Sequence, residues 1–327
     1  MTLPSPVRHG EDPMGGDLML SIVAPCFNEA EGIREFHRRV HAVCKHYASH
    51  EIILVDDGSK DETWREISAL AHEDPRVRGL RLSRNFGHQA ALTAGLSAAR
   101  GARVLMIDAD LQDPPELLPA MMTMMDEGVE VVYGKRTKRR GESLFKRTTA
   151  AAFYRIMSKL AEVDIPIDAG DFRLVDRRVL NALLAMPERY RFVRGMIAWI
   201  GFRQAPLEYV RESRHAGKTH YTLARMIKFS ADAITGFSTV PLQFAHMIAN
   251  LALLVGLATL IYIGYAWVSG LTVPGWASIL SAIALFSSVQ MFVLGVIGDY
   301  LGRMYMETKG RPLYIVADRI EHGPTER

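Results

Sequence analysis

The chain has 327 residues, of which 49% are hydrophobic and 23% are charged, so it is long enough for one large or two ordinary domains and too apolar for wholesale disorder. None of its 39 basic and 36 acidic residues lies between residues 233 and 298, and a gap of 66 residues without charge excludes a purely soluble protein. The net charge of +3, with no basic stripe interleaved with aromatic residues, excludes a typical nucleic-acid-binding protein.

The N-terminal residues 1–16 are predicted to form a flexible polar leader, and no apolar stretch before Leu18 resembles a cleavable signal peptide. The two cysteines, Cys26 and Cys44, are too few for a disulfide framework. They favour a domain on the reduced, cytosolic side of a membrane.

Short apolar runs alternate with helical patterns as far as residue 133. The predicted strands are residues 18–24, 51–55, 77–82, 103–107 and 129–133. The predicted helices are residues 29–46, 61–72, 87–99 and 114–127. This alternation is typical of βαβ units and predicts an α/β fold, with a mostly parallel sheet, helices on both faces and a ligand site at the carboxyl edge of the strands.

Two amphipathic segments and two apolar segments follow the predicted sheet. Residues 143–162 form a predicted amphipathic helix that either packs on the core or lies on a lipid surface, and residues 223–240 form a second one next to the membrane. Residues 242–268 and 276–301 are each long enough to cross a bilayer, since about 20 helical residues span the hydrocarbon core.

Basic residues flank the two predicted spans on one side only, which predicts that both chain ends are cytoplasmic. These residues are Arg225, Lys228, Arg303, Lys309 and Arg311. The predicted organisation is a cytosolic domain over 17–222, a juxtamembrane helix over 223–240, two transmembrane helices over 241–302 and a cytosolic tail over 303–327. The strand-like run 311–317 offers an edge for pairing with a neighbouring subunit.

The motif DADLQD follows the fourth predicted strand, at the expected ligand edge. Along an extended backbone, Asp108, Asp110 and Gln112 would point the same way. Three oxygen-bearing side chains suit a hard cation such as Mg²⁺ or Mn²⁺. The alternative is a pair of solvated aspartates, which are common at strand ends.

Polar side chains also follow the first two strands. Asp56 and Asp57 end the second strand, and Pro25, Asn28 and Glu29 follow the first. Carboxylates at this edge can accept hydrogen bonds from a nucleobase or a ribose, although Asp56 and Asp57 also begin a tight turn that would cap the next helix. Neither a dinucleotide-binding G-x-G-x-x-G nor a P-loop occurs, which excludes the usual oxidoreductases and P-loop kinases.

Taken together, these motifs resemble the family 2 glycosyltransferases with the GT-A fold, and in particular the polyprenyl-phosphate glycosyltransferases, a group that includes bactoprenol glucosyltransferases and dolichyl-phosphate mannose synthases. The matching segments are 84–95, 108–116, 134–136, 168–179, 188–202 and 237–242. The resemblance implies transfer of one sugar, with UDP-glucose as the expected donor, to a polyprenyl phosphate of the undecaprenyl type at the cytosolic face of the bacterial inner membrane. It also implies a Mg²⁺ or Mn²⁺ cofactor and a homo-oligomer, such as a tetramer.

The resemblance assigns a role to each candidate residue. It places Pro25, Asn28, Glu29, Asp56, Asp57 and Asp108 at the donor nucleotide; Asp110 and Gln112 at the metal; Asp113 beside the acceptor; and Arg136, Arg139, Arg191, Arg194 and Lys218 at the acceptor phosphate. The catalytic set is then Asp108, Asp110, Asp113 and Arg136. For Arg191 and Arg194, solvated charges on a loop are the alternative.

The implied chemistry is a single displacement that inverts the anomeric centre, because an anionic lipid phosphate attacks without a strong base. Other readings are the same reaction with GDP-mannose or a UDP-aminoarabinose donor, a processive polysaccharide synthase, and an inactive membrane scaffold that binds nucleotide sugars. A processive synthase normally carries a Q-x-x-R-W segment, which is absent, and a scaffold would be expected to have lost Asp108, Asp110 and Gln112, which are present.

Overall fold

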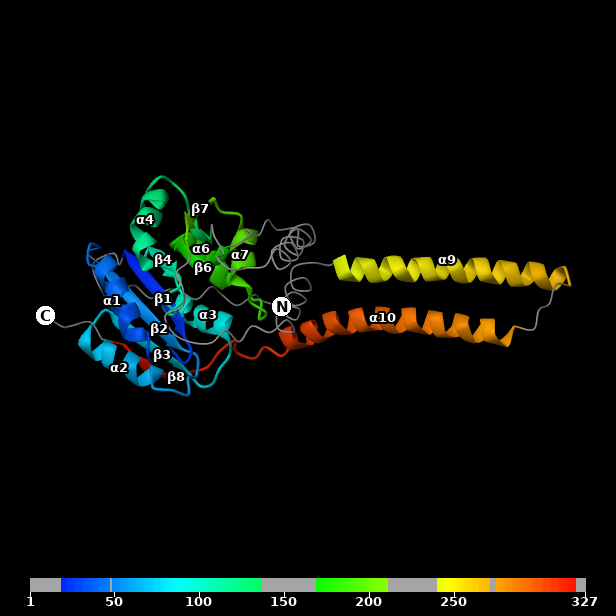
Figure 1. The fold of residues 1–327 in the computed structure, drawn as a ribbon, viewed down its shortest axis with the longest axis horizontal. Coiled ribbons are helices and arrows are strands. Elements are labelled where there is room, and N and C mark those ends of the chain that lie inside the picture. Colours follow the sequence, from blue (N-terminus) through cyan, green and yellow to red (C-terminus); the bar gives the residue numbers. More distant parts are fainter. Residues whose placement is uncertain (1–18, 48, 137–168, 211–239, 271–274, 322–327) are drawn as a thin grey trace, which may run out of the picture.

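The computed structural model describes residues 19–47, 49–136, 169–210, 240–270 and 275–321 (Figure 1). The predicted leader, the amphipathic helix over 143–162 and nearly all of the one over 223–240 lie outside the described residues.

The described residues contain an eight-stranded sheet in the order β7-β5-β6-β4-β1-β2-β3-β8. The strands are β1 Leu20–Cys26, β2 His50–Asp56, β3 Val77–Leu82, β4 Arg103–Met106, β5 Val131–Arg136, β6 Ala169–Asp176, β7 Gln204–Tyr209 and β8 Val316–Ile320. Neighbouring strands are parallel except where β6 pairs with β4 and β5, and where β8 pairs with β3. The predicted mostly parallel sheet is therefore confirmed.

Helices cover both faces of this sheet (Figure 1). They are α1 Ile33–Cys44, α2 Thr63–Glu73, α3 His88–Ala98, the short 3₁₀ turn η1 Pro115–Leu117, α4 Leu118–Asp126, α6 Arg177–Ala185 and α7 Val193–Ile200. One buried cluster joins the sheet to α1, α2 and α4, and the other joins it to α3, α6 and α7.

Strand β2 shows how the sequence builds the two layers. Ile52 and Leu54 belong to the first cluster, while Ile53 and Val55 belong to the second, as expected when successive side chains point to opposite faces. Every residue of β2 is buried, which explains its near-continuous apolar run.

Helix α3 approaches the sheet closely at Gly95. A Cβ atom there would lie 2.9 Å from Val55 Cγ2 and closer still to Val23 Cγ1. We expect Gly95→Ala to lower the free energy of unfolding by about 1–3 kcal/mol through overpacking. Thermal unfolding of the purified protein in detergent measures this loss, with Gly302→Ala as the matched control, because a Cβ at Gly302 meets nothing within 4 Å. Equal unfolding temperatures for the two variants would contradict the expected tight packing.

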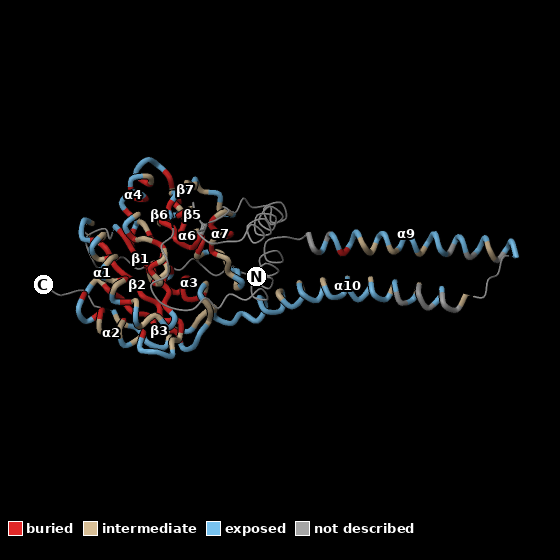
Figure 2. Tube along the Cα trace, viewed as in Figure 1, coloured by how far each residue is buried: buried red, intermediate tan, exposed pale blue. Residues whose placement is uncertain are grey.

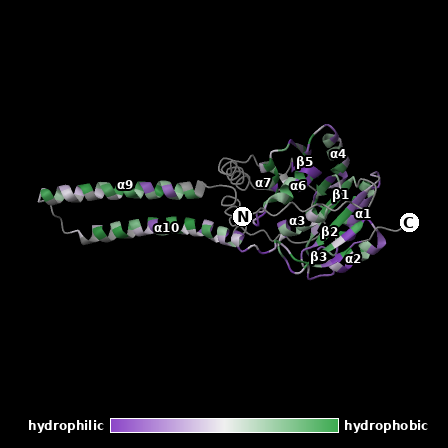
Figure 3. Cartoon of the chain, turned by 180° about the vertical axis from the view of Figure 1, so that it is seen from behind, coloured by the Kyte–Doolittle hydropathy of each residue, from purple (hydrophilic) through white to green (hydrophobic). Residues whose placement is uncertain are grey.

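Two long helices, α9 Val240–Val268 and α10 Trp276–Thr308, extend together from the domain (Figure 1). Their stretches Phe244–Ala266 and Leu285–Thr308 have mean hydropathies of 2.1 and 1.4 and are long and apolar enough to cross a membrane. Both helices are largely exposed in Figure 2 and largely apolar in Figure 3. Exposure of an apolar surface of this length to water is unfavourable, so these helices are candidate membrane spans.

The C-terminal segment departs from its prediction. Strand β8 begins at Val316 and pairs with β3 of the same chain, with Gly79 opposite Ile320 and Arg81 opposite Asp318. The tail is thus strand-like as predicted, but its strand starts at Val316 and pairs within its own chain, where β8 covers the edge that β3 would otherwise expose. The tail also ties the sheet to α10, which runs to Thr308 and thus beyond the predicted end of the span at residue 302.

Candidate active site

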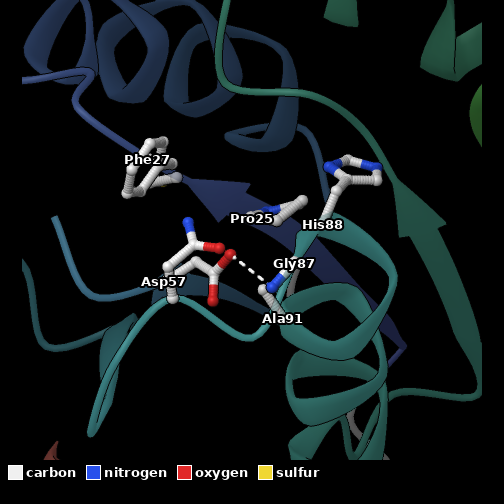
Figure 4. A pocket seen from close by; sticks show the side chains of 8 residues that line it. Pro25, Phe27, Asp57, Gly87, His88 and Ala91 are labelled. Carbon is white, nitrogen blue, oxygen red and sulfur yellow. Dashed lines mark hydrogen bonds between the residues drawn. The ribbon is translucent and has the colours of Figure 1, made fainter. Parts of the chain in front are cut away.

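A pocket lies where β1 and β2 end and α3 begins (Figure 4). Its lining comes from Pro25, Cys26, Phe27, Asp57, Asn85, Gly87, His88 and Ala91. In Figure 4, Phe27 and His88 lie on opposite sides of Pro25. The predicted position at the carboxyl edge of parallel strands therefore holds, and Pro25 and Asp57 are among the lining residues.

Asn28 joins the loop after β1 to the loop after β2. Its backbone N–H donates to Ser59 Oγ over 2.9 Å, and its side-chain Oδ1 accepts from the backbone N–H of Lys60 over 2.9 Å. Asn28 has a φ of 56°, which asparagine tolerates better than most residues. Beside it, the backbone N–H of Glu29 donates to Thr63 Oγ1. Asn28 and Glu29 are thus not among the lining residues, and their hydrogen bonds hold the loop that follows Phe27.

Asp57 connects the pocket to the start of α3. Its two carboxylate oxygens accept from the backbone N–H groups of Phe86 and Gly87, over 2.8 and 3.0 Å. Figure 4 shows the bond to Gly87. Burial raises the pKa of Asp57, and these two hydrogen bonds only partly offset the rise. A carboxylate has about four lone-pair sites, so Asp57 can still accept from a ligand in the pocket.

Asp56 does not lie in the pocket, contrary to its predicted place at the nucleotide. It is fully buried, and its Oδ1 accepts from the backbone N–H of Ser59 over 2.9 Å. Arg81 Nε lies 3.6 Å from its Oδ2. The structure therefore corrects its role to stabilising the turn after β2, the alternative already visible in the sequence.

The acidic segment after β4 turns instead of continuing as an extended strand. Leu111 has a φ of 60°, and the backbone N–H of Gln112 donates to Asp110 Oδ1 over 3.1 Å. Asp108, Asp110 and Gln112 are nevertheless half-buried, whereas the residues between them are buried. The predicted extended backbone, along which Asp108, Asp110 and Gln112 would point the same way, is therefore wrong, and a turn leaves the three side chains partly exposed.

Asp113 belongs to a buried network with Arg136 and Tyr209. It is 1% exposed, and Arg136 Nη2 lies 3.4 Å from each of its carboxylate oxygens. The hydroxyl of Tyr209 donates to Asp113 Oδ1 and accepts from Arg136 Nε, the latter over 3.2 Å. The predicted contact of Asp113 with an acceptor is corrected, because this carboxylate has almost no accessible surface and instead holds Arg136.

A second ionic cluster lies between α3, β6 and α7. Asp171 Oδ2 is 3.0 Å from His88 Nε2 and accepts from Gln89 Nε2, while Arg194 Nε is 2.9 Å from Asp171 Oδ1. His88 Nε2 also lies 3.6 Å from Asp108 Oδ1. The cluster therefore connects α7 to the acidic segment.

The pKa values of His88 and Asp108 are both raised within this cluster. Partial burial lowers the pKa of His88, but the hydrogen bond to Asp171 and the charge of Asp108 outweigh it and raise the pKa to about 9. Burial raises the pKa of Asp108 to about 6, against the attraction of His88 and with the support of Asp171, Asp110 and Asp113. The raised pKa of Asp108 therefore reflects its burial first, and the nearby carboxylates add negative charge that a cation would offset.

The predicted phosphate-binding arginines separate into different roles. Arg191 donates through Nη1 to the carbonyl of Leu183 and through Nη2 to that of Met186, over 3.3 and 2.6 Å. It therefore caps the end of α6, and its predicted phosphate role is corrected. Arg194 reaches the cluster around Asp171. Arg139 and Lys218 lie outside the described residues.

Sequence reasoning assigned no role to His88, Asp171 or Tyr209. His88 and Asp171 lie within the matching segments 84–95 and 168–179, which were the available signal for both residues. Tyr209 carried no local signal, because its partner Asp113 is 96 residues away in the sequence.

Within the part of the chain that the structure describes, two groups of side chains are of a type that binds metals. The oxygen atoms of Asp108, Asp110 and Gln112 suit a hard divalent cation. Elsewhere, His37, His41 and Asp74 cluster on α1 and after α2. There Arg76 already places Nε 2.8 Å from Asp74 Oδ1 and Nη2 3.1 Å from His41 Nδ1, so that group forms an ion-pair network.

Comparisons with known proteins show which sequences and structures this chain resembles. A model of the family described as "Glycosyl transferase family 2" matches residues 21–184. The uncharacterized glycosyltransferase YkcC of Bacillus subtilis (strain 168) is 45% identical over 93% of this chain and 94% of its own length. The bactoprenol glucosyl transferase of Shigella phage SfX is 38% identical over 92% of this chain and 100% of its own length. Among solved structures, the mannosyltransferase PcManGT from Pyrobaculum calidifontis, in complex with GDP-Man and Mn²⁺, has a TM-score of 0.45 and 18% identity, and covers 88% of each chain.

Proposed function

Because the chain belongs to glycosyl transferase family 2, we propose that it transfers one glucose from UDP-glucose to a polyprenyl phosphate in the membrane. Relatives named bactoprenol glucosyl transferase support this acceptor and this sugar, and their similarity extends over the candidate spans. One observation carries the proposal: the pocket and the acidic segment belong to a domain whose sheet is joined through β8 to the exposed apolar helix α10. Because α10 is a candidate membrane span, this connection would hold the domain at the bilayer surface, where a lipid acceptor lies.

The donor nucleotide is proposed to occupy the pocket after β1 and β2. Phe27 is 43% exposed and offers an aromatic surface for a base, while the carboxylate of Asp57 offers a hydrogen-bond acceptor. Asn28 and Glu29, which follow Phe27 in the chain, are proposed to contact the nucleotide from the same loop. Asp108, whose Oδ1 is 3.6 Å from Nε2 of the pocket residue His88, is proposed to face the ribose.

Asp110 and Gln112 are proposed to hold a Mg²⁺ or Mn²⁺ ion, with Asp108 beside it. The oxygen donor set and the accumulated negative charge fit such an ion. When bound, the cation neutralises charge on the departing diphosphate. The turn at Leu111 keeps Asp110 and Gln112 together through the hydrogen bond between them.

Arg136 is proposed to bind the acceptor phosphate. Its Nε and Nη2 are used by Tyr209 and Asp113, and Nη1 makes no hydrogen bond to any described residue. A guanidinium fixed in this way adds positive charge that needs no rearrangement during the reaction. A lipid monophosphate already carries negative charge near neutral pH, so it attacks the anomeric carbon directly, and a single displacement inverts that centre.

The proposed topology places the catalytic domain and both chain ends on the cytoplasmic side of the bacterial inner membrane. Basic residues Arg303 and Lys309 lie at the domain end of α10, whereas the connector after α9 carries none. A reporter active only outside the cytoplasm is expected to be silent when fused after β8 and active when inserted at residues 271–274. The reverse pattern would contradict the topology.

A donor screen tests the proposed function. Membranes containing the protein are incubated with undecaprenyl phosphate and, in separate reactions, labelled UDP-glucose, GDP-mannose and a UDP-aminoarabinose-type donor. Label from UDP-glucose is expected in the lipid extract, dependent on added Mg²⁺ or Mn²⁺. Label that enters the lipid only from another donor would overturn the assignment of glucose, and no lipid label from any donor would overturn the acceptor.

A further inference from the structure

Strand β7 places Tyr209 next to Arg136. The two strands β5 and β7 are parallel, and their register sets Arg136 opposite Tyr209 at the ends of both strands. The last residues of β5 and β7 therefore meet at the carboxyl edge of the sheet, where the proposed acceptor site lies.

The hydroxyl of Tyr209 bridges the two charged groups of the network. It donates to Asp113 Oδ1 and accepts from Arg136 Nε. Only 6% of Tyr209 is exposed, and burial together with the charge of Asp113 raises the pKa of its hydroxyl well above the ordinary value. The hydroxyl consequently keeps its proton and its two hydrogen bonds across the physiological pH range.

The ring of Tyr209 and the guanidinium of Arg136 both pack closely against glycines. A Cβ at Gly134 would lie 2.7 Å from Phe172 Cδ1 and 2.8 Å from Tyr209 Cε1, and a Cβ at Gly170 would lie 2.7 Å from Arg136 Nη2. The Phe172 and Tyr209 rings pack edge to face, with centroids 5.9 Å apart. Glycine on both sides thus lets the ring and the guanidinium approach closely.

The geometry points to Tyr209 as a positioning residue that directs the free Nη1 of Arg136 toward the acceptor phosphate, an inference that rests on the proposed function. Without the hydroxyl, Nε of Arg136 loses its partner, and the guanidinium is free to rotate about the remaining contact with Asp113. The planar fork of an arginine binds phosphate well only when its orientation is fixed.

The variant Tyr209→Phe tests this inference in the full-length protein, with undecaprenyl phosphate and UDP-glucose as substrates. We expect the KM for undecaprenyl phosphate to rise about tenfold, the usual scale for one hydrogen bond to a charged group, with the KM for UDP-glucose unchanged. Tyr47→Phe is the matched control, because Tyr47 is partly buried between α1 and β2, and three strands separate β2 from the strand β5 that carries Arg136. The double variant of Tyr209→Phe with Asp113→Asn should weaken acceptor use by less than the product of the single effects, since both residues act through Arg136.

Three results would overturn the positioning role of Tyr209. An unchanged acceptor KM in Tyr209→Phe, with active wild type, would overturn the positioning role alone. Equal increases in the KM of both substrates, with a lowered unfolding temperature, would reduce Tyr209 to a structural residue and also overturn it. A wild-type protein that transfers no sugar to undecaprenyl phosphate would overturn the proposed function, and this inference with it.

Discussion

Replacing Asp110 by alanine is expected to lower kcat by about 100- to 1000-fold, the scale expected when several kcal/mol of charge neutralisation at a metal site are lost. The expectation rests on the partly exposed carboxylate in the turn after β4 and on its hydrogen bond to Gln112. The change is measured as initial rates of lipid glycosylation at saturating UDP-glucose over a titration of Mg²⁺ and Mn²⁺.

Asp126→Ala is the matched control for this variant. Asp126 ends α4, is 67% exposed and pairs only at the surface with Arg103, so its loss should leave the rate unchanged. Wild-type turnover by Asp110→Ala in excess Mg²⁺ would remove Asp110 from the proposed metal site.

Replacing Arg136 by alanine is expected to lower kcat/KM for the lipid phosphate by about 100-fold, the scale of losing one preorganised donor to a developing charge. Donor binding should change little, because the nucleotide pocket is lined by other residues. Steady-state kinetics with each substrate varied in turn separate these two effects.

Two further variants complete this test. Lys135→Ala is the matched control, because Lys135 is the neighbouring cation on β5 and pairs with Glu208 at the surface. Arg136→Lys retains a charge beside the buried Asp113, so it should fold normally. It should still lose most of the kcat/KM for the lipid phosphate. An unchanged acceptor KM and kcat in Arg136→Lys would argue against the proposed contact.

The regular part of the sheet was predictable from the sequence because its strands are buried on both faces. The strand predicted over residues 77–82 is β3 as observed, and the other four predicted strands differ from β1, β2, β4 and β5 by a few residues at their ends. Continuous apolar runs between helical patterns carry this signal wherever helices cover the sheet.

Strand β6 escaped prediction because charged residues interrupt it. Asp171 and Arg173 are nevertheless 9% and 0% exposed, since the strand lies in the middle of the sheet between β4 and β5. A charge that is buried in an ionic cluster has the same sequence signature as a charge in a solvated loop. Tertiary contacts alone distinguish the two.

In the candidate site, too, the roles of several residues depend on tertiary contacts that the sequence does not show. The positions of Asp110 and Gln112 followed from the motif, but the role of Asp113 depends on Tyr209, which is distant in the sequence. Arg191 and Arg194 are three residues apart and equally basic, yet one caps α6 and the other contacts Asp171. No local pattern separates these roles.

The central claim, transfer of one glucose to a lipid phosphate, is tested most directly by identifying the nucleotide that the purified protein releases from UDP-glucose. The reaction contains undecaprenyl phosphate and Mg²⁺. Transfer of the sugar alone predicts one UDP for each lipid product. Mass spectrometry should find that product with a single phosphate, and NMR of its anomeric proton should find a β-linked glucose. Release of UMP with a lipid diphosphate, or of UDP with free glucose and unmodified lipid, would contradict the proposed reaction.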